Sequence, residues 1–313
     1  MAPNPSQFPL GAPTTSGTEI TVDQWLNSPT TITRALADMI VQSEDFFVGE
    51  VFASIGNVSG GAILYNPVLE NNLYADRDVQ EIEPGAEYPI LTSDIGEPKV
   101  ARVRKFGGKI YISDEARQRN RIDIWNREQM KLANTLAAQL NAVAMAVLDA
   151  AIVDRDRSTG GVRTASGGSW VDATRVRLAD TNPAATPAAD FAAVVKRARE
   201  ERQGLRFDTL IVNPQEAMHL DLIYGERPGG VEGVLSRFGI RRMFVSSYQR
   251  AGQAKFVAAR QVGVVGTEAP MGTVTYREEG RDVTWVQSRA KPVIAVDNRW
   301  AIWELTDLDR SSS

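Results

Sequence analysis

The fold of this chain is decided by Val100-Ala-Arg-Val-Arg-Lys-Phe-Gly-Gly-Lys-Ile-Tyr-Ile112, a basic alternating stretch that continues through Ser113-Asp-Glu115 into a long helical pattern. The helical part contains no glycine or proline as far as Ile152. Its apolar residues recur every three or four positions, the period of a helix with one apolar face, at Leu132, Leu136, Leu140, Val143 and Val147. This pattern predicts one helix over Ser113–Ile152, roughly 55–60 Å long at about 1.5 Å per residue, with those five side chains as its packing residues.

Such a helix is about three times the average length of helices in globular proteins. A narrow apolar face on so long an element is typical of a strut that lies against several partners. A coiled coil is the alternative, but no heptads extend the pattern and both flanks are strand-like. Ser113 or Asp114 can cap the N-terminus, with acidic residues in the first turn where the helix dipole favours them.

Composition sets limits on function. The chain has 313 residues, 43% hydrophobic and 24% charged, as in soluble globular proteins of one large or two ordinary domains. It has no cysteine, which excludes thiol catalysis, disulfides and cysteine-bound metals, and its single histidine excludes mechanisms that need two. A net charge of −4 gives no general affinity for nucleic acid. We expect neither a membrane span nor a signal peptide.

The motifs that would indicate ligand binding or catalysis are incomplete in this sequence. Gly107-Gly108-Lys109 lacks the frame of a phosphate-binding loop and is interpreted as a bend before a strand. The Asp154-x-Asp156-x-Ser158 stretch lacks the glycine and glutamate of a calcium loop. His219 is interpreted as a surface or interface residue, and no serine lies in a nucleophile elbow. We therefore expect no enzyme, and no catalytic, cofactor-binding or metal site.

Charge is divided unevenly around the strand that precedes the helix. Residues 66–98 carry eight acids and one base, whereas residues 99–131 carry ten bases and four acids. The turn formers around Ile95-Gly96-Glu97-Pro98 predict a hairpin tip between an acidic and a basic arm. These charges either pair across the hairpin or meet opposite charges on a neighbouring subunit. The candidates for contacts between subunits are Asp78, Glu81, Glu83, Glu87, Arg102, Arg104 and Lys105.

The rest of the chain is mixed α and β. A short amphipathic helix is predicted over Thr30–Val41. After a Gly/Ser/Thr-rich connector, we predict helices from Thr186-Pro187 to Gly204 and from Asn213-Pro214 to about Tyr224. Strands are predicted at Phe207–Val212, Arg242–Ser246, Lys255–Ala258, Val262–Val265, Pro292–Val296 and Trp300–Leu305, and a hairpin over Val274–Val286 that turns at Glu279-Gly280.

The middle of the chain resembles the major capsid proteins of tailed bacteriophages of the Hong Kong-phage type, whose fold is shared with encapsulin shells. It is especially similar to those of phages that infect actinobacteria. The resemblance covers about Gly60 to Ala150 well and the rest by order of elements. It is carried by Leu73–Pro89, Gly96–Ala101, Lys105–Glu115, Arg117–Asp123 and Leu132–Leu136.

The resemblance implies an α+β fold in four parts. Residues 1–60 would be the N-arm, and residues 61–112 an extended β-hairpin loop that reaches over a neighbouring subunit. Residues 113–175 and 272–300 would form the peripheral domain with its spine helix. Residues 176–271 and 301–313 would form an α/β axial domain around the symmetry axes of pentamers and hexamers.

The implied function is self-assembly into the icosahedral head shell that encloses double-stranded DNA, which the shell would contact non-specifically. Because only about 60 residues precede the loop, we expect a separate scaffolding protein, with a portal and a decoration protein as further candidate partners. The protein would be made in the bacterial host cytoplasm and reside in the virion. Lys99, Lys105 and Lys109 are available for the covalent cross-links of some members, but we assign none. The alternatives are an encapsulin-like shell around cargo and a monomeric α/β enzyme.

Overall fold

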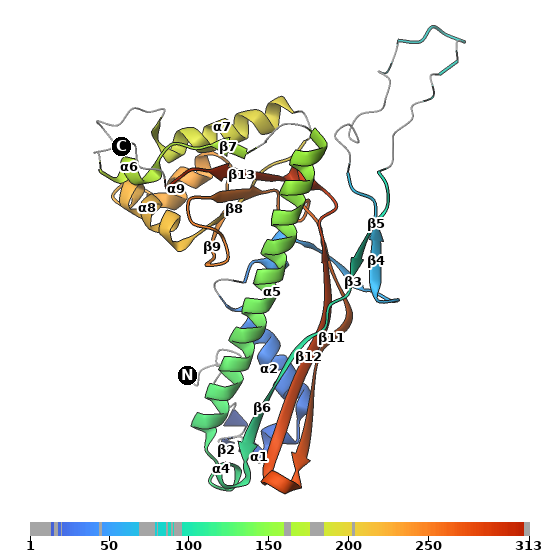
Figure 1. The fold of residues 1–313 in the computed structure, drawn as a ribbon, viewed down its shortest axis with the longest axis vertical. Helices are drawn as coiled ribbons and strands as arrows, with labels where there is room; N and C mark the ends of the chain where they lie inside the picture. Colours follow the sequence, from blue (N-terminus) through green and yellow to red (C-terminus); the bar gives the residue numbers. More distant parts are fainter. Residues whose placement is uncertain are drawn as a thin grey trace.

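The structure is a computed structural model, and it describes residues 14–15, 18–19, 21–43, 46–68, 79, 81–85, 87–88, 90, 96–159, 164–175, 185–201 and 204–309. The described chain is elongated (Figure 1), with a five-stranded sheet at one end and a four-stranded sheet of long strands running to the other. Helix α5 (Ile122–Thr159) extends along both and joins them. We call the two parts the five-stranded unit and the four-stranded unit.

The four-stranded sheet has the order β3-β11-β12-β6. Its centre is the hairpin of β11 (Val264–Glu278) and β12 (Val283–Ala295), joined by the 3₁₀ turn Glu279–Arg281, so the predicted turn is confirmed. On one side β6 (Phe106–Ser113) pairs with β12, and on the other β3 (Ala53–Asn57) runs parallel to β11. The hairpin strands are much longer than the predicted Val274–Val286 and include Pro292 within β12.

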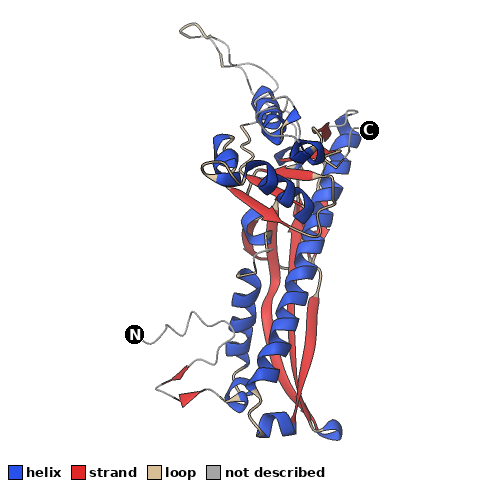
Figure 2. Cartoon of the chain, turned by 90° about the vertical axis from the view of Figure 1, so that its left-hand side faces the viewer, coloured by secondary structure: helices blue, strands red, loops and turns tan. Residues whose placement is uncertain are grey.

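One face of this sheet is covered by α2 (Pro29–Val41) and α5, which lie side by side across the long strands (Figure 2). The predicted helix at Thr30–Val41 is therefore confirmed. Its buried side chains Ile32, Leu36 and Ile40 form a core with Ile110 and Ile112 of β6. The short elements before it are β1 (Thr14–Thr15), β2 (Thr18–Glu19) and α1 (Val22–Leu26).

The five-stranded sheet has the order β7-β13-β10-β8-β9; its two outer pairs are parallel and its two inner pairs are antiparallel. Its strands are β7 (Thr164–Ser166), β8 (Thr209–Val212), β9 (Arg242–Val245), β10 (Ala254–Val257) and β13 (Ile302–Thr306). Around it lie α6 (Trp170–Arg175), α7 (Pro187–Glu200), α8 (Pro214–Tyr224) and α9 (Gly230–Arg237). Most of the predicted helices and strands here are confirmed within a few residues.

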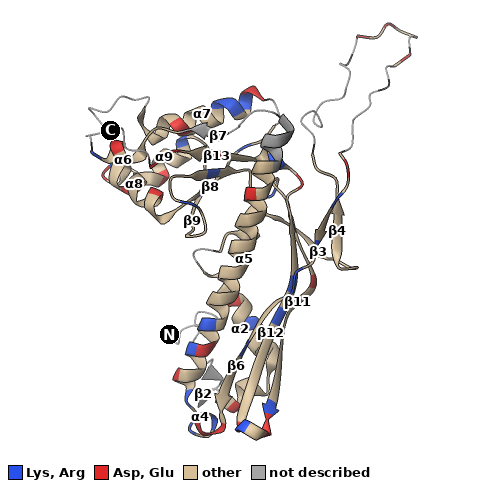
Figure 3. Cartoon of the chain, viewed as in Figure 1, with Lys and Arg blue, Asp and Glu red and all other residues tan. Residues whose placement is uncertain are grey.

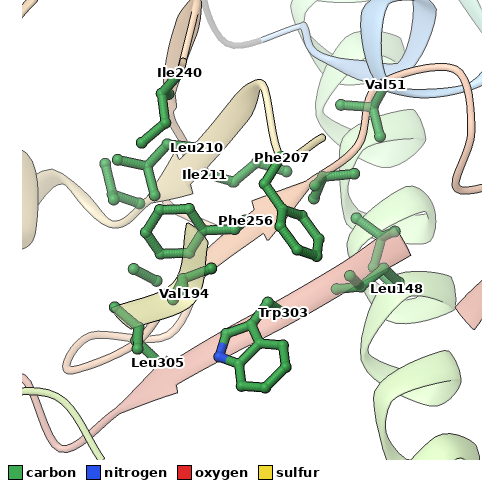
Figure 4. Close-up of a cluster of buried hydrophobic side chains, with 14 of the residues drawn as sticks. Val51, Leu148, Val194, Phe207, Leu210, Ile211, Ile240, Phe256, Trp303 and Leu305 are labelled. Carbon is green, nitrogen blue, oxygen red and sulfur yellow. The ribbon is translucent and has the colours of Figure 1, made fainter. Parts of the chain in front are cut away.

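The core of this unit combines sheet residues with side chains from distant parts of the sequence (Figure 4). Phe207, Leu210, Phe256 and Trp303 are buried, and Leu148 of α5 lies beside them. Val51 of α3 (Val48–Val51) joins the same core, so the segment just before β3 is built into this unit.

The predicted single helix from Ser113 is wrong at its start, because α4 (Asp114–Gln118) is separated from α5. Asn120 between them has φ of +48°, a left-handed conformation that asparagine tolerates better than most residues. Its side-chain oxygen also accepts a hydrogen bond from the backbone N–H of Val22 at 2.9 Å. A long-range contact therefore sets the break, while α5 continues past Ile152 to Thr159.

The predicted packing face of α5 is also only partly right. Leu132 and Leu136 are buried, but Leu140, Val143 and Val147 are half-buried. The fully buried positions shift around the helix from Trp125 and Gln129 to Ala144, Met145, Leu148 and Ile152. This shift follows from the change of partner, since the first half of α5 packs in the four-stranded unit and the second half in the five-stranded one. Ile122–Val153 has the length and mean hydropathy, 1.8 over its most apolar window, of a membrane span, and packing in two cores accounts for this.

The predicted hairpin tip at Ile95–Pro98 is wrong as well. The paired strands are β4 (Ala62–Tyr65) and β5 (Lys99–Arg102), in the register Ala62↔Arg102 and Tyr65↔Lys99. Gly96–Pro98 therefore lies at the foot of the projecting segment. Gly96 is buried against Pro67, where a Cβ would lie 2.6 Å from the carbonyl oxygen of Pro67, so this close approach requires glycine.

Candidate functional site: the base of the projecting loop

The β4–β5 hairpin is the base of the segment between these strands, and the described parts of that segment lie away from the body of the molecule (Figure 1). Three hydrogen bonds fix it to the end of β12 and the chain that follows. The backbone N–H of Arg104 donates to the carbonyl of Pro292 at 3.0 Å, and that of Val68 donates to the carbonyl of Asp297 at 2.8 Å. The indole of Trp300 donates to the carbonyl of Val68 at 3.1 Å. The base is therefore held rigidly relative to α5 and the four-stranded sheet.

Arg102 of β5 has no charged residue opposite it on β4. Arg102 lies opposite Ala62, and β4 has the uncharged sequence Ala-Ile-Leu-Tyr. Arg102, Arg104 and Lys105 are exposed, as are Glu81, Glu83 and Glu87 on the projecting segment (Figure 3). Asp78 lies outside the described residues. The arrangement rules out cross-strand pairing between β4 and β5 as the explanation of the charge division.

Beside the base lies a groove of about 550 Å³ between α5, β12 and β5. Its apolar lining includes Val143, Ala146, Val147 and Ala150 of α5 and Pro292 and Ile294 of β12. Its charged lining residues are Lys99, Arg102, Arg104, Asp297 and Arg299. Two of the predicted packing residues, Val143 and Val147, thus line this groove, and Val147 also packs against the core of the five-stranded unit.

A buried ionic cluster, which the sequence patterns did not predict, joins α5 to the five-stranded sheet. The side chain of Lys255 on β10 is only 1% exposed. Its Nζ lies 2.9 Å from Oδ1 of Asp149, 3.1 Å from Oε1 of Glu304 and 2.7 Å from Oε1 of Gln249. All three ammonium protons thus have an acceptor, which is what burial of a lysine requires. A lysine within a strand that is otherwise apolar was the only sequence signal.

Other buried ionisable groups occur singly. His219, expected at a surface or an interface, is buried on α8 within the single chain, and burial lowers its pKa. Burial raises the pKa of Glu216, although its Oε1 accepts a hydrogen bond from the backbone N–H of Gly252 at 2.7 Å. Burial also raises the pKa of Asp190, which accepts from the Trp170 indole at 2.9 Å. Among the described residues, no three His, Asp or Glu side chains lie together as a metal site would need.

Comparison with known protein families matches residues 96–304 to the model for the phage capsid protein family. This range includes β5, α5, both strands of the long hairpin and most of the five-stranded unit. No curated protein matches the chain by sequence.

Solved structures of similar fold include a virus-like particle from Pyrococcus furiosus, with 14% identity and a TM-score of 0.58, covering 88% of this chain and 98% of that one. The structure titled Mycobacterium phage Bobi has 11% identity and a TM-score of 0.56, covering 86% and 89%. That titled Microbacterium phage Oxtober96 has 12% identity and a TM-score of 0.55, covering 82% and 89%. The fold is thus that of phage capsid and virus-like particle subunits. With the match over residues 96–304, this chain belongs to the phage capsid protein family.

Proposed function

We propose that this capsid protein assembles with copies of itself into the icosahedral head shell of a tailed phage, as pentamers and hexamers around double-stranded DNA. The observation that carries the proposal is a firmly anchored hairpin base followed by a segment in which three large apolar side chains, among the described residues, are exposed. Val79, Tyr88 and Ile90 are 83%, 79% and 76% exposed. Exposed apolar residues gathered on one extended element are typical of surfaces that bind a partner.

In this proposal the five-stranded unit serves as the axial domain, and the four-stranded unit with α5 as the peripheral domain. The charged residues of the loop region, including Arg102, Arg104, Lys105 and the acids Glu81, Glu83 and Glu87, would contact other subunits. A separate scaffolding protein, a portal and a decoration protein are the candidate partners in the head. DNA contacts would be non-specific, and synthesis would take place in the host cytoplasm.

The role is structural and needs no catalysis. The fold and the family support that conclusion, and each closed shell would repeat the same few contacts in every copy.

Negative-stain imaging of the purified protein, expressed alone and with a scaffolding protein, tests the proposal. We expect capsomers or closed shells, and nuclease-protected DNA in heads made during infection. Monomers under every condition would overturn the proposal. Shells that enclose a co-purified enzyme and never DNA would instead support the encapsulin-like alternative, which the similarity to the virus-like particle fold motivates.

A further inference from the structure

We infer that an arginine-lined hollow on the five-stranded unit binds the phosphate backbone of double-stranded DNA, and that this side of the unit therefore faces the inside of the shell. The inference rests on the proposed function and names the surface through which the shell contacts its DNA. Three observations carry it: a local excess of positive charge, arginines without partners, and a lining that exposes no large apolar side chain.

The arginine-lined hollow has a volume of about 2520 Å³ and lies among α7, α9 and β9, the strand at one edge of the five-stranded sheet. Its lining includes six basic and four acidic side chains, although the whole chain has a net charge of −4. Positive charge is therefore concentrated here against the balance of the chain. The basic residues are Lys196, Arg199, Arg206, Arg237, Arg241 and Arg242, and the acidic ones are Glu200, Asp208, Asp221 and Glu232.

Two of the basic side chains already have a partner within the chain. Nζ of Lys196 lies 3.5 Å from Oε1 of Glu200, and Nη1 of Arg242 lies 2.9 Å from Oε1 of Glu50. The other four are exposed, and their side chains form no hydrogen bond or ion pair with any residue that the structure describes; they are Arg199, Arg206, Arg237 and Arg241. Their guanidinium groups are free to donate to phosphate oxygens, which their planar fork suits.

The four arginines come from four separate segments around the hollow. Arg199 and Arg237 lie in the last turns of α7 and α9. Arg206 lies between α7 and β8, and Arg241 lies directly before β9, where its backbone N–H donates to the carbonyl of Asp208 at 2.7 Å. Cations spread in this way match a polymer with closely and evenly spaced charges, and duplex DNA carries one negative charge per about 1.7 Å of its axis.

The apolar part of the lining favours DNA over an acidic protein segment as the occupant. A protein partner is normally held by large apolar side chains that become buried at the centre of the interface. None of the large apolar side chains that are exposed among the described residues lines this hollow. Those that line it and are already buried in the subunit include Phe207, Val231, Leu235 and Ile240.

Contacts of this kind position DNA without reading its sequence, because every nucleotide presents the same phosphate. The hollow thus provides a specific structural basis for non-specific binding. It also accounts for DNA contact by a chain whose net charge is negative, since the excess of positive charge is local.

Arginine modification by phenylglyoxal, followed by mass spectrometry, tests the contact in DNA-filled heads and in heads emptied of DNA. The four arginines should be modified about fivefold more slowly in filled heads, because a guanidinium held by phosphate is withdrawn from the reagent. Arg119 and Arg289 are the internal controls, both exposed in the four-stranded unit, and should be modified equally in both kinds of head. Arg119 follows α4 at the opposite end of the molecule (Figure 1).

The outcomes separate this inference from the proposed function. Equal modification of the four arginines in filled and emptied heads would overturn it, and protection in both would mean that a neighbouring subunit covers the hollow. Protection only in precursor shells that still contain a scaffolding protein would assign an acidic protein and also overturn it. Equal protection of the control arginines would contradict a localised contact. Absence of any shell, under every condition, would remove the proposed function as well.

Salt-dependent binding of a short DNA duplex to the unassembled full chain supplies an independent test. Arg237→Gln with Arg241→Gln should reduce the slope of log affinity against log salt by about 1.8, since each phosphate contact contributes about 0.9. Arg119→Gln with Arg289→Gln removes the same charge elsewhere and should leave the slope unchanged. Circular dichroism checks that both variants are folded. An unchanged slope in the first variant, an equal loss in the second, or no binding by the parent chain at low salt would contradict the inference.

Discussion

The five-stranded unit and the projecting loop differ in how completely a single chain buries their apolar side chains and pairs their charged groups. In the five-stranded unit, β8 and β10 are buried along their whole length, and the ammonium of Lys255 has three acceptors. In the loop region, β4 and β5 form a two-stranded sheet whose residues Leu64 and Val100 are largely exposed. A two-stranded hairpin of this kind is marginal by itself. The five-stranded unit therefore stabilises the single subunit, whereas the loop region, in the proposed function, binds other subunits.

Replacing Lys255 by methionine should have the largest effect on the free subunit. The carboxylates of Asp149 and Glu304 would lose their cation, and breaking a buried ion pair in this way costs about 3–5 kcal/mol. Lys291→Met is the matched control, because its pair with Glu268 at 2.9 Å is partly exposed and is worth about 1 kcal/mol or less. Urea unfolding of both variants measures the difference. Equal losses would contradict the idea that the cluster locks α5 to the sheet.

Truncation along α5 should separate fully buried positions from half-buried ones. Leu136 is 8% exposed, so Leu136→Ala should cost about 2–5 kcal/mol, toward the lower end because the cavity opens near the helix surface. Leu140→Ala, at a half-buried position one turn later, should cost clearly less. Thermal unfolding of the two variants compares them directly. A larger loss at Leu140 would mean that the buried face of α5 has been assigned wrongly.

Ionisation of Glu216 should make the five-stranded unit weaker as pH rises. Burial raises its pKa above the ordinary value of 4.5, so the folded state holds the proton more tightly than the unfolded state. Its stabilising contribution is present below pH 4.5 and is lost as pH rises through the raised pKa. Glu216→Gln should therefore raise the unfolding temperature at pH 7 but not at pH 4. The exposed Glu232→Gln serves as the control, and a parallel shift at both pH values would exclude this explanation.

The smallest effect on stability is expected in the loop base. Arg102→Glu with Arg104→Glu should change the unfolding free energy of the free subunit by about 0.5 kcal/mol or less, as exposed substitutions usually do. Circular dichroism and urea unfolding of the unassembled protein check this. A loss of several kcal/mol would show that the arginines support the subunit itself, and the comparison drawn above would then fail.

Local pattern was enough to predict much of the fold. The periods of α2, α5, α7 and α8 and the β11–β12 hairpin depend on residues close together in sequence, and each was found near its expected position. Where these predictions were wrong, the cause was a contact between residues distant in sequence. Asn120 ends the continuous helix because it contacts Val22, and Leu140 is only half-buried because α5 changes partners along its length.

The candidate site was harder to predict from the sequence than the helices and strands were. Its charged residues were recognised, but their supposed hairpin partners were wrong, because β5 pairs with β4 across more than thirty intervening residues. The groove forms only where α5, β12 and β5 lie together in the folded chain, and no local sequence pattern predicts that these three elements are adjacent. The Lys255 cluster likewise brings together Asp149, Gln249 and Glu304 from three separate segments.

The sequence by itself determined the long helix, the long hairpin, the charge division and the resemblance to phage capsid proteins, since periodicity, turn residues and composition are properties of neighbouring residues. Only the tertiary structure decided which strand lies beside β5, which face of α5 is left uncovered and where Lys255 finds its acceptors. Those features depend on residues that are distant in sequence, and the free energy of burying or pairing a side chain is set by the neighbours that folding brings to it.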